Sequence, residues 1–190
     1  MEKQEVFKKE LDYIVNNDIK ESLSIMINHI PDYFFTIPAS STGKYHPSYA
    51  TGDGGLVRHT KSAVRMAVEL FGIYKFSQET KDLIIFSLVL HDSVKKGIEE
   101  EKYTRFDHPL VAVDFIKEHS KELKLTKEQL DLVSDCISSH MGRFNTSEYS
   151  DIILPLPKSV EQKFVHMCDY LASRKVIDIH FDKNNNIVEE

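Results

Sequence analysis

Apolar residues recur along most of the chain at the three- and four-residue spacing of an amphipathic helix. Helix starts are marked by capping boxes at 126–129 and 159–162, and Pro109 suits a first helical turn. The pattern predicts an all-α bundle with helices at about residues 3–16, 19–29, 56–71, 78–92, 109–120, 127–142 and 159–174.

Two segments depart from the helical pattern. Residues 39–55 form a polar stretch rich in Gly, Ser and Thr, which predicts a long loop of functional importance. Residues 175–190 alternate apolar and polar positions around three asparagines, which predicts a small C-terminal β-hairpin. We expect one domain over residues 1–190, divided into N-terminal helices and loop (1–55), a helical core (56–174) and the hairpin (175–190).

Composition narrows the classes of partner. The formal net charge of −6 disfavours a protein that coats long nucleic acid, while a small phosphorylated ligand remains compatible with it. No apolar run reaches the roughly 20 residues of a membrane helix, and the first residues do not resemble a signal peptide. These observations predict a cytoplasmic protein without a membrane partner.

Several polar residues occupy positions where a helical pattern expects apolar ones. The segment Leu83–Leu90 is apolar almost all round and leads directly into a His-Asp pair, so it is expected to be a central helix. Other histidines and an aspartate continue apolar rows of neighbouring helices. The resulting set is His59, His91, Asp92, His108, His140 and Asp169. Imidazole nitrogens and carboxylate oxygens are ligands of borderline divalent metals, so the set predicts a metal centre.

The order of these residues resembles the HD-domain superfamily of metal-dependent phosphohydrolases. The histidine after Gly-Gly-Leu, the His-Asp doublet, two further histidines and a last aspartate follow one another between residues 54 and 174. The GGLVRHT and SSHMGRF stretches are similar to the HD domain of bacterial 3′–5′ exoribonucleases and to stand-alone phage-type HD proteins. The resemblance implies an HD-type helical bundle.

The resemblance also implies how the ligands are shared. His59, His91, Asp92 and Asp169 would form one metal site, and Asp92 would bridge to a second site with His108 and His140. Two divalent ions are expected, with Mn first and Fe, Ni, Co, Zn or Mg as alternatives.

The expected activity is hydrolysis of a phosphoester in a nucleotide, cyclic nucleotide or short oligonucleotide, by a water activated between the two metals. Asp92 and Lys95 are the candidate catalytic residues. Candidate substrate-binding residues are Arg143 and, in the long loop, Lys44, Tyr45 and His46. Lys95 is equally compatible with a solvated lysine at a helix end, and the loop with a purely connecting role.

Other functions stay open at this point. One is a metal-dependent 3′–5′ nuclease on longer RNA or DNA, one is a non-catalytic scaffold that binds a nucleotide or protein, and a last one is iron-based redox chemistry. The doublet is followed by Ser93-Val94-Lys95, where many relatives have Ile-Gly-Lys. The Gly-Tyr-Pro signature of cyclic-dinucleotide phosphodiesterases and the strands of an OB-fold are missing from the sequence, so those two subgroups are disfavoured.

Overall fold

The computed structural model describes residues 2–40, 43 and 46–177, and this part of the chain is all-α. Its α-helices are α1 (Lys3–Val6), α2 (Lys8–Asp12), α3 (Asn17–His29), α4 (Gly55–Leu70), α5 (Gln78–Leu90), α6 (His108–Glu118), α7 (Lys127–Ser138) and α8 (Val160–Ala172). Short 3-10 turns are η1 (Asp32–Phe35), η2 (Ser48–Ala50), η3 (Ser120–Glu122), η4 (Gly142–Phe144) and η5 (Lys175–Ile177). The described residues contain no β-strand.

Helix α5 is the centre of the molecule, as its apolar sequence predicts. Every residue from Leu83 to Leu90 is buried, and the helix packs against α3, α4, α7 and α8. The single hydroxyl in this stretch, on Ser87, donates to the Leu83 carbonyl at 2.8 Å, so its burial leaves no donor unsatisfied. The end of α5 is therefore held from several sides at once.

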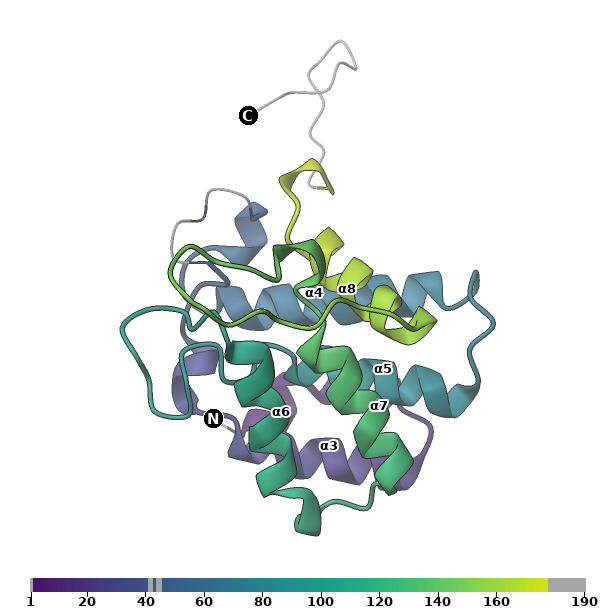
Figure 1. Ribbon diagram of the computed structural model, residues 1–190. Helices are drawn as coiled ribbons and strands as arrows, with labels where there is room; N and C mark the ends of the chain where they lie inside the picture. Colours follow the sequence, from purple (N-terminus) through teal and green to yellow (C-terminus); the bar gives the residue numbers. More distant parts are fainter. Residues whose placement is uncertain (1, 41–42, 44–45, 178–190) are drawn as a thin grey trace, which may run out of the picture.

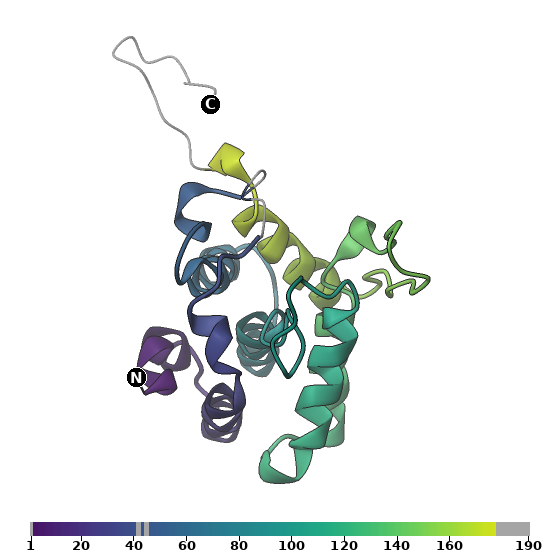
Figure 2. The ribbon, with the colours of Figure 1, turned by 90° about the vertical axis from the view of Figure 1, so that its left-hand side faces the viewer.

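In Figure 2 the helices α3, α4 and α5 are seen almost end-on, whereas α6 and α7 are seen from the side and run at a steep angle to the other three. Helix α8 lies along α4, in the most extensive helix pair of the fold (Figure 1). The buried apolar side chains form one continuous cluster that runs from Phe7 to Ala172. Within the described ranges, no helix has both the length and the apolarity needed to cross a bilayer.

Two predicted helices differ most from those of the structure. The segment 3–16 is divided at Phe7, whose backbone leaves helical geometry (φ −106°, ψ 18°) while its buried ring packs against Phe34 and Phe35 with centroids 6.1 and 6.3 Å away. Helix α7 ends at Ser138 rather than residue 142, because the chain turns sharply and Gly142 adopts a positive φ of 54°. Tertiary packing decides both boundaries.

The long loop before α4 is partly built into the fold. Ala39 donates its N–H to the Ala50 carbonyl at 3.0 Å, and Leu56 donates to Ile37 at 2.9 Å. Gly55 has no space for a side chain, since a Cβ there would lie 2.4 Å from the Ala50 carbonyl oxygen. The glycine thus permits the loop to lie directly on the start of α4.

The C-terminal hairpin predicted at 175–190 is not supported. Lys175–Ile177 form the 3-10 turn η5 instead of the start of a strand. The remaining residues of that prediction, 178–190, lie outside the described part of the chain.

Candidate metal centre

Five helices contribute to a buried group of imidazoles and carboxylates. His59 lies in α4, His91 and Asp92 follow α5, His108 begins α6, His140 follows α7, and Asp169 lies in α8. The five residues other than Asp169 are at most 3% exposed, and the Asp169 side chain is 17% exposed. The structure therefore brings together all six residues selected from the sequence.

The pairing of α4 with α8 creates one half of the group. His59 Nε2 lies 2.9 Å from Asp169 Oδ1, and His91 Nε2 lies 3.4 Å from the same oxygen. His91 comes from the adjacent end of α5. These three side chains form a set whose ligand atoms all lie within 4.8 Å of one another.

Asp92 faces two sets of imidazoles with its two oxygens. Oδ2 lies 3.5 Å from His91 Nε2 and 4.0 Å from His59 Nε2. Oδ1 lies 3.0 Å from His108 Nε2 and 3.7 Å from His140 Nε2, and these two nitrogens are 3.2 Å apart. One carboxylate is thus placed between two potential ion positions.

Backbone carbonyls orient three of the four imidazoles. The Nδ1 atoms of His91, His108 and His140 each lie 2.7 Å from a carbonyl oxygen three residues earlier, those of Leu88, Arg105 and Ile137. Leu88 and Ile137 lie in the last turns of α5 and α7, where carbonyls lack an intrahelical partner and are available as acceptors, and Arg105 lies in the loop before α6. In the neutral form of each ring, donation from Nδ1 leaves Nε2 without a proton and turned into the group, as metal ligation requires.

The charges are strongly coupled. Burial opposes the charged form of Asp92, but Lys95, His91 and His108 outweigh it and hold the pKa well below its usual value. Burial likewise opposes protonation of His91, yet Asp92 and Asp169 raise its pKa to about 9. Burial and the neighbouring His91 lower the pKa of His140 to about 3. The two carboxylates thus favour the protonated form of His91, and metal binding to His91 would displace that proton.

Several polar atoms at the centre lack hydrogen-bond partners. His91 Nε2 and Asp92 Oδ1 are fully buried and form no hydrogen bond, although imidazole and carboxylate atoms lie 3.0–3.5 Å away, and such groups are rarely left without one in a protein. A second set, His91, Asp92 and His140, also has its ligand atoms within 4.8 Å of one another. These buried groups fit a divalent ion, which would satisfy the free lone pairs.

A cavity of about 150 Å³ opens onto this centre. Its polar floor includes His59, Asp92 and His140, and its walls are formed by residues from η4, α8 and the loop before α4. The wall residues are His46, Lys95, Met141, Phe144, His166, Asp169, Tyr170, Ser173 and Arg174. The candidate ligands are thus reached from outside through a mixed aromatic and basic opening.

Of the other predicted site residues, some line the cavity and some do not. Lys95 lines the cavity, with Nζ 2.6 Å from Asp92 Oδ2. His46 also lines it, its ring 5.6 Å from that of His59, and burial together with His59 lowers its pKa to about 4. Lys44 and Tyr45 lie outside the described residues. Arg143 does not belong to the lining; it donates to the Tyr170 hydroxyl at 3.2 Å.

His166, which is not among the six ligands predicted from the sequence, supports the centre. Its Nδ1 lies 2.6 Å from the His140 carbonyl oxygen, and its ring fills the space beside Gly142, where a Cβ would lie 2.2 Å from His166 Cε1. Arg174, which stacks over the Tyr170 ring at 4.5 Å, was also missed. Helical spacing places His166 one turn before Asp169, and this position could have identified His166 as a neighbour of the centre from the sequence.

Comparisons with known proteins give no relative: no protein-family model, no curated protein and no solved structure matches the chain. The centre is therefore interpreted from its own residues and geometry.

Proposed function

We propose that this chain is a metal-dependent phosphohydrolase of the HD type that binds two divalent ions. The observation that carries the proposal is the position of Asp92, whose two oxygens face separate pairs of imidazole nitrogens, His59 with His91 and His108 with His140. A structural zinc site is the simpler use of such residues, but those sites favour cysteine and close at four ligands. Six converging ligands suit a pair of ions better.

The residues divide between two ion positions. His59, His91 and Asp169 serve the first, His108 and His140 serve the second, and Asp92 bridges them. His91 also lies within reach of the second position, because its nitrogen belongs to both compact sets. Nitrogen and carboxylate ligands without sulfur suit Mn, Fe, Co, Ni or Zn, with Mg less well matched to imidazoles.

When bound, such a pair of ions lowers the pKa of a water molecule and stabilises negative charge on phosphoryl oxygens. The chain's part is to hold the ligand set rigidly, since five of its members are almost fully buried and three of its imidazoles contact backbone carbonyls. Asp92 acts as the shared anionic ligand. His140 remains neutral, which keeps its Nε2 lone pair free.

Lys95 is proposed to bind a phosphoryl oxygen. Its ammonium is largely buried at the cavity and pairs with Asp92 at 2.6 Å. With ions held by Asp92, that attraction would be weaker, and the Lys95 ammonium would be available to a substrate oxygen. A charge-assisted contact of this kind contributes about 1.5–3 kcal/mol.

The outer wall suits a nucleotide. A cavity of about 150 Å³ is small compared with the roughly 300–1,000 Å³ of most ligand pockets, so we infer that the phosphate enters it and the base stays at the mouth. Tyr170 and Phe144 offer aromatic faces there, and Arg174 adds a positive charge. Arg143 is proposed to act farther out on the substrate and His46 beside His59. Lys44 and Tyr45 remain proposed substrate-binding residues.

The test is phosphate release and product mapping with metal-free protein and added Mn²⁺. The substrates are nucleotides, cyclic nucleotides, short RNAs and long RNA, assayed with wild type, Asp92→Asn and Asp114→Asn. Asp114 is exposed on α6, so its variant makes the same chemical change away from the centre. We expect metal-dependent turnover that falls about 10³-fold in Asp92→Asn and is unchanged in Asp114→Asn.

The substrate that turns over best distinguishes the small-nucleotide activity from a nuclease on longer chains. Full turnover by Asp92→Asn would overturn the two-ion assignment. If two ions bind but no substrate is turned over, redox chemistry becomes the favoured function. If no ion binds, a non-catalytic binding scaffold becomes the favoured function.

A further inference from the structure

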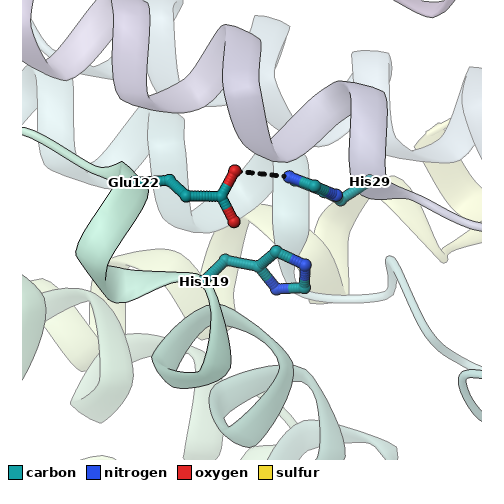
Figure 3. Close-up of side chains that lie close together, drawn as sticks. All are labelled: His29, His119 and Glu122. Atoms are coloured by element: carbon teal, nitrogen blue, oxygen red, sulfur yellow. Dashed lines mark hydrogen bonds and ion pairs between the residues drawn. The ribbon is translucent and has the colours of Figure 1, made fainter.

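A second group of potential metal ligands lies on the surface, outside the buried centre. His29 is the last residue of α3, His119 follows the last residue of α6, and Glu122 lies in η3 (Figure 3). His29 Nε2 is 3.1 Å from Glu122 Oε2, and the two imidazole rings lie with centroids 4.0 Å apart. One ligand atom from each residue lies within 4.8 Å of the other two.

These distances are close to those of a coordinated ion. Metal–nitrogen and metal–oxygen bonds of about 2.0–2.1 Å in a tetrahedral site separate neighbouring ligand atoms by about 3.3 Å. The His29–Glu122 distance of 3.1 Å already approaches that value. Rotation of exposed side chains is sufficient to bring the third ligand to the same separation, because no member of the group is fully buried.

The protonation pattern of His119 favours ligation. Its Nδ1 lies 2.9 Å from the Phe115 carbonyl oxygen, so donation there leaves Nε2 as a free lone pair. The potential at this corner also favours a cation, since α3 and α6 both end here and the C-terminal end of a helix carries partial negative charge.

We propose that His29, His119 and Glu122 bind one borderline divalent ion, such as Zn²⁺, and thereby join the end of α3 to the corner between α6 and η3. Two imidazoles and one carboxylate supply three ligands, and water completes the shell. The ligands come from positions about 90 residues apart in sequence, so the ion acts as a cross-link that reduces the freedom of the unfolded chain.

Polar contacts of Lys124 also connect this corner to α3. The Lys124 N–H donates to Ser22 Oγ at 2.9 Å, and Lys124 Nζ forms an exposed ion pair with Glu21 at 2.8 Å. Exposed ion pairs contribute little stability, usually below about 1 kcal/mol. An ion at the surface group would therefore add a stronger connection than the exposed ion pair provides.

The experiment measures Zn²⁺ bound per chain and the metal-induced rise in melting temperature, without any assay of activity. The full-length chain carries Asp92→Asn in every sample, so that the buried centre has lost its bridging ligand. Onto this background are added His29→Gln, His119→Gln or Glu122→Gln. The matched control is Glu118→Gln, an exposed carboxylate in the same segment that is not part of the group.

We expect each histidine variant to lose one equivalent of bound Zn²⁺ and the part of the melting-temperature rise that this ion causes. Glu122→Gln should bind the ion at least tenfold more weakly. Glu118→Gln should bind Zn²⁺ like the Asp92→Asn protein without a further substitution. Melting temperatures without metal verify that the variants fold. Equal Zn²⁺ binding by His119→Gln and Glu118→Gln would overturn the proposal and leave an ordinary His29–Glu122 ion pair. Because no substrate is used, this outcome is independent of the phosphohydrolase proposal.

Discussion

The chain brings histidines and carboxylates together in its core and again at its surface, and the two groups differ in their surroundings. In the core, three imidazoles are oriented by backbone carbonyls and nearly all members are buried. At the surface, only His119 has such a carbonyl partner, and His29 and Glu122 are exposed. The type of ligand alone therefore does not determine the properties of a metal site. Burial and the hydrogen bonds to the ligands' other atoms decide how far the ligands are fixed before an ion binds.

The comparison also predicts an order of affinities. The buried group combines two carboxylates shielded from water with imidazoles that already face them, so a divalent ion gains strongly from binding there. The surface group is solvated, and its carboxylate is screened by water and salt. We expect the buried centre to fill first and the surface group to require more metal.

The largest expected effect is the loss of metal-induced stability at the buried centre. Mn²⁺ at 100 times its dissociation constant stabilises the fold by about 2.7 kcal/mol, which corresponds to a rise of roughly 5–10 °C in melting temperature for a domain of this size. In Asp92→Ala most of that rise should disappear. Differential scanning calorimetry with and without Mn²⁺ measures it, and an unchanged rise in the variant would place the main binding at another group.

The next effect concerns the positive charge beside Asp92. Lys95→Met should lower turnover by about 10- to 100-fold, because the variant removes the proposed contact to a phosphoryl oxygen. Lys96→Met is the matched control, since the Lys96 side chain pairs with Glu100 on the surface. Steady-state kinetics of both variants measure the difference. Equal turnover rates would mean that Lys95 does not bind the substrate and only balances the charge of Asp92 in the metal-free protein.

Gly142 tests how tightly the support of the core centre is packed. A Cβ at this position would collide with the His166 ring and meet a positive φ, so Gly142→Ala should cost about 2–4 kcal/mol of unfolding free energy. Gly72→Ala, where no atom lies within 4 Å of the added Cβ, should change stability by less than about 0.5 kcal/mol. Denaturant unfolding gives both values.

A double variant sharpens the same test. In His166→Ala the ring is gone, so adding Gly142→Ala should cost only the backbone strain, about 1–2 kcal/mol. If Gly142→Ala costs the same with and without the His166 ring, the collision is not the reason for the glycine.

The smallest effect is expected in the turn that carries Lys95. The Tyr33 hydroxyl donates to the Gly97 carbonyl at 2.6 Å and accepts from the Lys96 N–H at 3.1 Å, and burial raises its pKa to about 12. Tyr33→Phe should lose about 1–2 kcal/mol of stability. Tyr13→Phe, which gives up only a 3.5 Å exposed contact with Arg65, is the control and should be nearly neutral in denaturant unfolding.

Sequence periodicity predicted the helical class and all six residues of the core group. It succeeded because polar residues on apolar faces are costly unless they have partners, so their positions carry information. Helix α5 is the clearest example, since its apolar run ends at the His91–Asp92 pair.

Other features were beyond the reach of the sequence. The division of the first helix at Phe7 and the position of His166 against Gly142 depend on long-range packing, which periodicity does not describe. The surface group was missed for the same reason, since His29 and His119 come from helix ends far apart in the chain. The sequence also predicted Arg143 as the arginine beside the centre, but the arginine that lines the cavity is Arg174.

The carbonyl contacts of His91, His108 and His140 have one more consequence. Each ring is oriented by an oxygen three residues earlier in its own segment, so the orientation is encoded locally and does not depend on a neighbouring helix. Such segments are modular: parts of the connections between them, such as residues 98–104 and 146–153, can change in length without reorienting a ring. A protein engineer can use the same independence, lengthening these loops to alter what reaches the cavity while the imidazoles keep their directions.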